Sequence, residues 1–146
     1  MNKIEIKNLC LVFGKEKLRA FKLLAKGKTK QEILKETGCV VAVDNANLSI
    51  REGEIFVIMG LSGSGKSTLL RCINGLIQRT SGDVLVNGTD ISDASDEELI
   101  LIRRKVLAMV FQNFGLLPHR SILHNIAFGS NYRVLRKRNE KERLWK

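Results

Sequence analysis

Residues 60–68 read GLSGSGKST and fit the pattern G-x-x-x-x-G-K-[ST], which is typical of a phosphate-binding loop. The apolar run 54–59 precedes the loop and predicts a short buried strand. Residues 67–75 follow it and predict a helix that ends at a glycine. The motif requires this order of strand, loop and helix. The alternative is an ordinary Gly/Ser turn between a strand and a helix.

The residue types in this loop suit an anionic ligand. Its glycines let the backbone turn tightly and aim N–H groups at an anion, and the start of a helix adds partial positive charge. Lys66 has the reach to contact the β- and γ-phosphates, and the Ser67 hydroxyl has the chemistry to ligate Mg²⁺. The predicted nucleotide-binding residues are Gly60, Leu61, Ser62, Gly63, Ser64, Gly65, Lys66, Ser67 and Thr68.

Length and composition favour one globular domain. The chain has 146 residues, of which 44% are hydrophobic and 27% charged. We find no apolar run near 18 residues and no secretory signal at the start. The three cysteines (Cys10, Cys39 and Cys72) show no metal or disulfide spacing, so we expect small buried side chains in a reducing cytoplasm.

The net charge of +10 is concentrated in two segments. Residues 15–39 carry eight basic and three acidic side chains, and residues 133–146 carry seven and two. Aromatic content is only 5%, so a stacking platform for nucleic acid is not expected. For the first segment we favour a solvated surface subdomain. The sharper hypothesis is contact with an anionic membrane face or a partner subunit.

The N-terminal third alternates between strand and helix patterns. A period-two strand opens the chain and ends near Phe13, which is either a packing residue or a flat surface for an adenine ring. Two short helices follow, the second opened by a capping box at Thr29 and Glu32. We expect Ile33 and Leu34 to face inward. Strand character resumes over 40–50.

Turn and cap signals organise the remainder. Residues 83–91 predict a β-hairpin around Asn87-Gly88. A second capping box at Ser95 opens a helix, and the apolar run 106–111 predicts a strand that ends at Gln112. Ser121 is expected to cap a further short helix.

Residues 54–68 and 109–119 together resemble the ATP-binding subunit of ATP-binding-cassette (ABC) importers. Within that group the chain is similar to the glycine betaine/proline (quaternary amine) branch. The branch-specific features are the strand end at Phe13-Gly14, the insert with AFKL at 20–23 and QEILKETG at 31–38, and the amino-acid sequence of the phosphate-binding loop. The resemblance covers residues 1–129.

The resemblance implies an α/β fold, the N-terminal portion of a P-loop ABC ATPase domain with an antiparallel β subdomain and a helical insert at 15–39. ATP and Mg²⁺ would be the cofactors, with Lys66 and Gln112 as catalytic residues, Ser67 and Gln112 on the metal, and Phe13 against the adenine. Residues 114–120 would meet a membrane-spanning permease subunit. The implied protein is a quaternary-amine-transporting ATPase for osmoprotectant import. It would pair with a second ATP-binding subunit at the inner face of the cell membrane.

Several motifs of that family are missing from the sequence. We find no Leu-Ser-Gly-Gly-Gln signature, no strand ending in Asp with an adjacent Glu base, and no switch His; no acidic residue lies between Glu98 and Glu140. Because phosphoryl transfer to water needs a held metal and a positioned base, we expect the chain alone to hydrolyse ATP poorly or not at all. Residues 130–146 are polar and basic. They form either a solvated tail or, by our preferred hypothesis, an out-of-frame end of a truncated copy.

Two other functions remain open at this point. One is a non-catalytic nucleotide-binding fragment or a non-functional truncated product. The other is a different P-loop enzyme such as a small-molecule kinase; a GTPase would need an Asn-Lys-x-Asp motif, which is absent. We further expect the strands at 54–59 and 106–111 to lack neighbours and the chain to be marginally stable.

Overall fold

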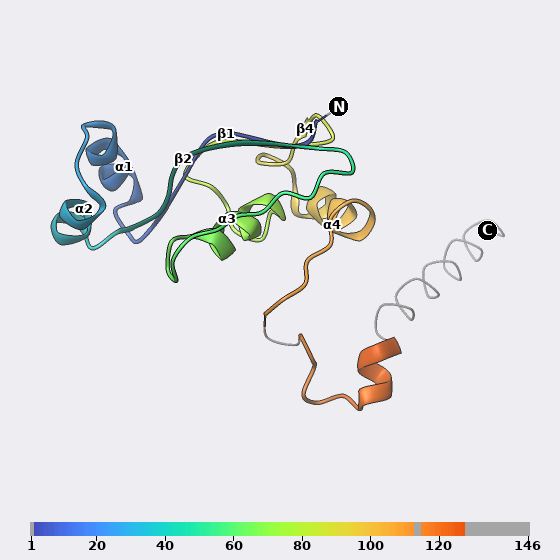
Figure 1. Ribbon diagram of the computed structural model, residues 1–146. Coiled ribbons are helices and arrows are strands. Elements are labelled where there is room, and N and C mark those ends of the chain that lie inside the picture. The colour runs from blue at the N-terminus through green and yellow to red at the C-terminus, as the bar shows by residue number, and fades with distance from the viewer. Residues whose placement is uncertain (1, 113–114, 128–146) are drawn as a thin grey trace, which may run out of the picture. The chain divides into compact units, whose positions relative to one another are not determined.

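The computed structural model describes residues 2–112 and 115–127 in two compact units, Met1–Ala108 and Met109–Lys146. The first contains a sheet and four helices, and the second contains a helix over 122–127. The resemblance predicted an α/β fold with an antiparallel subdomain, and the first unit has that character (Figure 1).

A long antiparallel hairpin forms the frame of the first unit. Strand β1 (Asn2–Phe13) pairs with β2 (Val40–Arg51), and β1 also pairs with β3 (Ser81–Val86), which turns into β4 (Thr89–Asp90). The sheet order is therefore β2-β1-β3-β4, antiparallel throughout. The hairpin predicted around Asn87-Gly88 is confirmed, because both residues take positive φ angles, 52° and 78°.

One face of the sheet is covered by helices α3 (Lys66–Ile73) and α4 (Asp96–Lys105), as Figure 1 shows. Their apolar side chains share a core with β1, β2 and β3. The buried members of this main core are Ile6, Leu9, Leu11, Val43, Leu69, Cys72, Ile73, Val84, Val86 and Ile91. This core fixes α3, and therefore the loop that precedes it, against β2.

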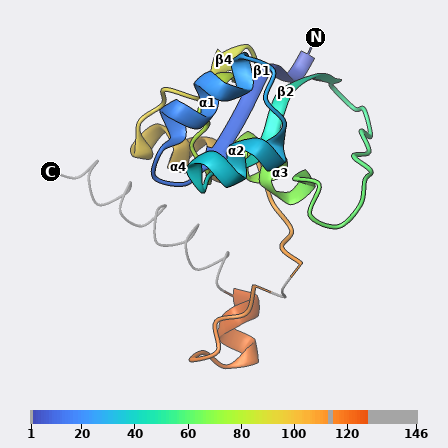
Figure 2. The same cartoon turned by 90° about the vertical axis from the view of Figure 1, so that its left-hand side faces the viewer.

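The insert between β1 and β2 has its own small core. Helices α1 (Lys17–Ala25) and α2 (Lys30–Thr37) lie side by side at one end of the hairpin (Figures 1 and 2). Their buried side chains pack with the strand ends; the members are Val12, Ala20, Ile33, Cys39 and Val41. The capping box at Thr29 is confirmed, and Gly38 ends α2 with a φ of 67°. The prediction that Leu34 faces inward is wrong, because Leu34 is exposed while Ile33 is fully buried.

Asparagine bulges let one hairpin serve both cores. The register between β1 and β2 shifts between Ile6 and Leu9, where Asn8 has a φ of 49°, and shifts again between Leu9 and Leu11, where Asn45 on β2 has a φ of 45°. Asn tolerates this left-handed conformation better than other side chains with a Cβ. The Asn47 side chain accepts a hydrogen bond of 2.8 Å from the Asn8 N–H. The bulges therefore re-aim side chains along the hairpin without leaving this N–H unpaired.

The two strands predicted at 54–59 and 106–111 are not formed. Residues 54–60 and 107–111 are described, and they have no regular secondary structure. The apolar side chains Ile55, Val57, Met59 and Val110 are exposed. The physical reason is the absence of a pairing strand among the described residues, since an apolar run becomes a strand only when another strand supplies its hydrogen bonds.

Candidate functional site

The phosphate-binding loop leaves β2 through a tight turn and enters α3. The Arg51 N–H donates to the Glu54 carboxylate (2.7 Å) and the Glu54 N–H donates to the Arg51 carbonyl (3.2 Å), which closes the turn at Gly53. The chain then runs extended to Gly60, and α3 begins at Lys66. Of the three parts of the motif, the loop and the helix are therefore present, but the strand that should precede the loop is not formed.

Gly65 is the residue on which the loop's position depends. Its φ is 92°, and a Cβ added there would lie 2.4 Å from the Ala42 carbonyl oxygen in β2. Both observations exclude a side chain, because the conformation is left-handed and the contact is with backbone that has no room to move. Gly65 therefore sets the start of α3 directly against the sheet.

Lys66 folds back across the loop. Its ammonium group donates to the carbonyl oxygens of Gly60 (2.8 Å) and Leu61 (2.7 Å), with the Ser64 hydroxyl at 3.3 Å. Three donors on one compact charge thus hold both sides of the loop together.

The first turn of α3 presents its N–H groups toward the loop. Over the part of the chain that the structure describes, the N–H groups of Lys66, Ser67 and Thr68 have no protein acceptor, while the Leu69 N–H donates to the Gly65 carbonyl (2.8 Å). Free first-turn donors and the helix dipole both favour an anion at this point. The Ser67 side chain is exposed beside them, as a metal ligand on a bound phosphate would need.

The C-terminal end of α3 is held by a residue that the sequence analysis did not single out. The Arg103 guanidinium of α4 donates to the carbonyl oxygens of Asn74 (3.4 Å) and Gly75 (3.2 Å). A cation at the last carbonyls of a helix complements its dipole. The sequence feature that could have identified Arg103 was the cluster of basic residues in the last turn of α4, the helix that packs against α3.

Phe13 lies at the same end of β2 as the phosphate-binding loop. Its pairing partner is Val40, two residues before Ala42, whose carbonyl oxygen faces Gly65. Phe13 is 39% exposed, so it is partly open to solvent. Phe13 as the adenine-stacking residue stays a prediction.

Gln112 belongs to the second unit, and its predicted contact with Mg²⁺ stays a prediction. Its side chain is exposed. Phe114 lies outside the described residues. Ser121 caps the helix over 122–127 as predicted, since its hydroxyl accepts from the His124 N–H (3.3 Å).

Asn125 was missed in the sequence and holds the loop at 117–121. Its side-chain oxygen accepts from the Leu117 N–H (2.8 Å), and its amide nitrogen donates to the carbonyl oxygens of Leu117 (3.2 Å), Arg120 (3.2 Å) and Ser121 (3.1 Å). One side chain thereby fixes the backbone between Pro118 and the helix. An Asn within a short helix gives no sequence signal that its side chain holds the backbone of the preceding loop.

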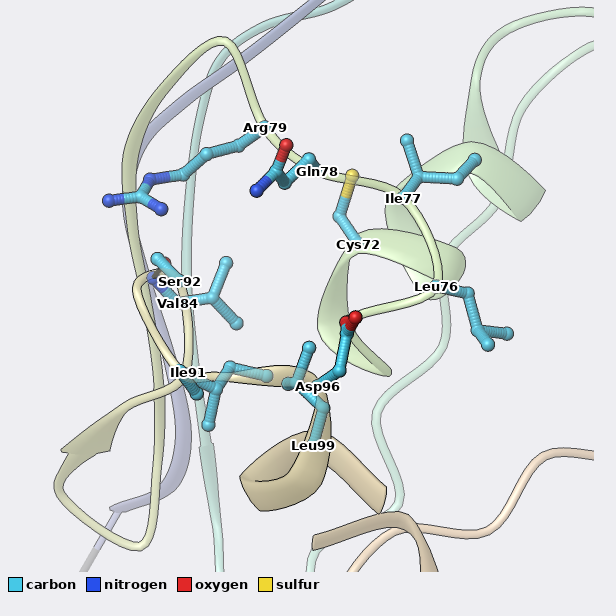
Figure 3. Close-up of a pocket in the computed structure, with 12 residues that line it drawn as sticks. Cys72, Leu76, Ile77, Gln78, Arg79, Val84, Ile91, Ser92, Asp96 and Leu99 are labelled. Carbon is cyan, nitrogen blue, oxygen red and sulfur yellow. Dashed lines mark hydrogen bonds between the residues drawn. The ribbon is translucent and has the colours of Figure 1, made fainter.

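A separate cavity of about 310 Å³ lies at the C-terminal end of α3, away from the phosphate-binding loop (Figure 3). It is bordered by Cys72 of α3, Val84 of β3, and Asp96 and Leu99 of α4, with Arg79 at one side. Burial raises the pKa of the Cys72 thiol, so this sulfur is a neutral packing group. All three cysteines are free and buried, as predicted.

Residues 2–112 and 115–127 contain no cluster of three or more His, Cys, Asp or Glu side chains suited to a metal ion. No helix within the same ranges has the length and hydropathy needed to cross a membrane.

The fold and the loop together are those of the N-terminal part of a P-loop NTPase domain, and sequence comparison assigns its family. The profile of the ABC transporter family matches residues 43–146, so the chain belongs to the ABC transporter family. A glycine betaine/proline betaine transport system ATP-binding protein from Salmonella typhimurium is 56% identical over 127 residues. A glycine betaine/carnitine transport ATP-binding protein from Listeria monocytogenes is 52% identical over 129 residues.

The matches cover most of this chain but only part of the relatives. The Salmonella alignment includes 87% of this chain and 32% of the relative, so the chain spans about a third of the length of the curated relatives it matches. A dimeric bacterial ABC transporter cassette superposes with a TM-score of 0.68 at 33% identity, over 88% of this chain and 47% of the other. The same cassette bound to ADP and phosphate gives a TM-score of 0.68 at 32% identity.

Proposed function

We propose that this chain is the nucleotide-binding part of an ATP-binding subunit that couples ATP hydrolysis to import of glycine betaine- or proline-type osmoprotectants. The observation that carries the proposal is the phosphate-binding loop: Gly65 seated on β2, Lys66 across the loop, and the free N–H groups at the start of α3. The identity to glycine betaine transport proteins supports the substrate class.

In this proposal the described residues perform binding and orientation. The loop backbone and Lys66 hold the phosphates, and Ser67 and Gln112 supply neutral oxygen ligands of the kind that Mg²⁺ accepts. The metal would be shared with the phosphates, because the described residues supply no acidic cluster of their own. When bound, Mg²⁺ neutralises charge that develops on the phosphates.

The proposed partners follow from the same assignment. The intact protein would pair with a second ATP-binding subunit and dock on a membrane-spanning permease at the cytoplasmic face. Residues 114–120 are our candidate for the permease contact, and 115–120 of them are described by the structure. The hydrogen bonds of the Asn125 side chain support this contact, because they hold the backbone of these residues in one conformation. A contact loop that is ordered beforehand binds with less entropic cost.

We propose that the 146-residue chain by itself binds nucleotide without turnover. No acidic residue lies between Glu98 and Glu140, so the sequence offers no carboxylate after Gln112 in the position of a base or metal ligand. The competing function is a non-catalytic nucleotide-binding fragment with no role in transport. The two differ in whether adding the rest of a cassette produces ATPase activity.

The direct test is nucleotide affinity of the purified chain, measured by calorimetry with ATP and Mg²⁺. We expect Lys66→Ala to weaken binding by roughly tenfold or more, since a charge-assisted contact to phosphate is lost. Lys30→Ala is the matched control, an exposed lysine on α2, and should leave the affinity unchanged. Equal affinity of the wild type and Lys66→Ala would contradict nucleotide binding at this loop.

A further inference from the structure

The sequence contains two Asn-Gly pairs, at 74–75 and at 87–88, and each follows a β-branched residue. In such a pair the glycine nitrogen is well placed to attack the asparagine side chain, because no Cβ on the glycine hinders the approach. This attack is the first step of deamidation, in which the side-chain amide becomes a carboxylate. The local sequences of the two pairs are matched, so their surroundings in the fold decide which one reacts.

The pair at 74–75 is held by the end of α3 and by α4. The Gly75 N–H donates to the Cys72 carbonyl (3.0 Å), and Asn74 is only 9% exposed. The Arg103 guanidinium donates to the carbonyl oxygens of Asn74 (3.4 Å) and Gly75 (3.2 Å). A ring between the Asn74 side chain and the Gly75 nitrogen can close only if the peptide between them rotates. These hydrogen bonds oppose that rotation, so the folded chain protects this pair.

The pair at 87–88 lies at the tip of the β3–β4 hairpin, and both residues are exposed (Figure 1). Within the described residues, no hydrogen bond engages the Gly88 N–H or the Asn87 side chain. The Asn87 N–H donates to the Lys3 carbonyl (2.8 Å), but this bond lies before the Asn87 Cα and does not hold the peptide that follows. Because β4 contains only two residues, few bonds oppose the opening of this turn.

We propose that Asn87 is a site of spontaneous deamidation in the folded chain, whereas Asn74 is protected. The Gly88 nitrogen loses its proton to hydroxide and attacks the side-chain carbonyl carbon of Asn87. The new C–N bond closes a succinimide ring, and the side-chain nitrogen takes up a proton and leaves as ammonia. Water then opens the ring, giving aspartate by attack on the side-chain carbonyl or isoaspartate by attack on the main-chain carbonyl. The net reaction consumes one water and releases one ammonia, and it requires neither nucleotide binding nor transport.

The isoaspartate product would disrupt the hairpin. Its main chain runs through the former side chain and gains one carbon, which a two-residue turn with fixed backbone angles does not accommodate. The two cross-strand pairs of β3 and β4 close directly on this turn. Ile91 follows β4 and is only 3% exposed in the main core, so a displaced β4 would pull on a buried side chain. We therefore expect chains with isoaspartate at this position to melt at a lower temperature than unmodified chains.

The test is incubation of the purified, folded chain at alkaline pH, with samples digested by trypsin at mildly acidic pH and measured by mass spectrometry. Trypsin places the two sites in separate peptides, 72–79 and 80–103, each with a single asparagine. Synthetic peptides distinguish aspartate from isoaspartate by their retention in chromatography. We expect peptide 80–103 to convert at least about tenfold faster than peptide 72–79, because a protected site reacts only from the fraction of molecules in which it has opened. Conversion should slow at mildly acidic pH, since the glycine nitrogen must lose its proton.

The same incubation in urea is the matched control, because unfolding removes the structural difference and keeps the local sequences. Both peptides should then convert at similar rates. Asn87→Asp carries the new charge without the extra carbon, so it should melt close to the wild type while chains enriched in isoaspartate melt below both. Equal conversion of the two peptides in the folded chain would overturn the proposal. So would a folded chain in which peptide 80–103 stays unchanged while it converts in urea.

Discussion

The β1–β2 hairpin and the segment 55–59 both contain strand-forming apolar residues, but only the hairpin buries and pairs them. In the hairpin, Ile6, Leu9 and Leu11 are nearly fully buried and their backbones are paired. In the segment, Ile55 and Met59 are almost fully exposed and their backbones make no bond among the described residues. The difference does not lie in local preference, because both runs are rich in strand-forming residues.

Availability of a partner explains the contrast. Leu11 faces Val43 across the hairpin and Ile6 faces both Leu48 and Val84, so every requirement of β1 is met within 85 residues. Segment 55–59 has the side chains of a strand, but no neighbouring strand pairs with it among the described residues. A strand is thus a property of a pair, and its pattern in a sequence predicts burial only where the pairing chain is also present.

The largest test of this contrast is a matched pair of isoleucines. We expect Ile6→Ala to lower the free energy of unfolding by about 2–5 kcal/mol, since it opens a cavity in the main core. Ile55→Ala removes the same atoms from a side chain in water and should change the stability by less than about 0.5 kcal/mol. Urea unfolding followed by circular dichroism measures both. Similar losses in the two variants would mean that Ile55 is buried in solution.

The same contrast explains what could be predicted from sequence. Features with local causes were recovered: the capping boxes at Thr29 and Ser95 and the Asn87-Gly88 turn depend on residues at most three positions apart. The helix that follows residues 60–65 was also predicted correctly, since α3 begins at Lys66, whereas phosphate binding by this loop stays a prediction. The strands predicted at 54–59 and 106–111 were wrong, since no strand among the described residues pairs with them.

Contacts between residues that are far apart in the sequence were the second kind of feature that could not be predicted. Arg103 reaches the end of α3 across 28 residues of sequence, and Asn125 brackets a loop eight residues away. Neither has a spacing that marks it. Leu34 was predicted to face inward because it is apolar, but Ile33 is the one buried residue of α2 and packs in the small core. The predicted roles of Phe13 and Gln112 concern ligands and stay predictions.

A second, smaller effect is expected in the insert. Ile33→Ala removes the central side chain of the small core between α1 and α2, and we expect a loss of about 2 kcal/mol in the stability of this region. Leu34→Ala is the adjacent control and should be near neutral. Hydrogen exchange of the α1 and α2 amides is the measurement, because the insert's core is separate from the main core. If Ile33→Ala destabilised β3 as strongly as α2, the two cores would be one cooperative unit.

Removing one helix cap from each core should give matched losses. Thr29→Ala and Ser95→Ala each delete the side chain that accepts from the N–H three residues on, at Glu32 and Glu98. We expect each to cost about 1 kcal/mol. Thr29→Ala should act on the exchange of α2 alone, and Ser95→Ala on that of α4. A change of exchange in the other helix would argue against the separation of the cores.

The smallest expected effect is a dependence on acid pH at Glu98. The Ser95 N–H and the Ser95 hydroxyl each donate to its carboxylate at 2.8 Å, and these bonds hold the pKa of Glu98 below its ordinary value of 4.5. Because the folded pKa is the lower one, the carboxylate stabilises the fold above about pH 4.5 and loses this contribution as the pH falls through the folded pKa. Glu98→Gln should therefore melt below the wild type at pH 7, and the gap should close toward pH 3. Glu97→Gln, one residue earlier and outside the capping box, controls for charge at the start of α4. A gap for Glu98→Gln that stayed constant with pH would show that the charge on this cap contributes nothing.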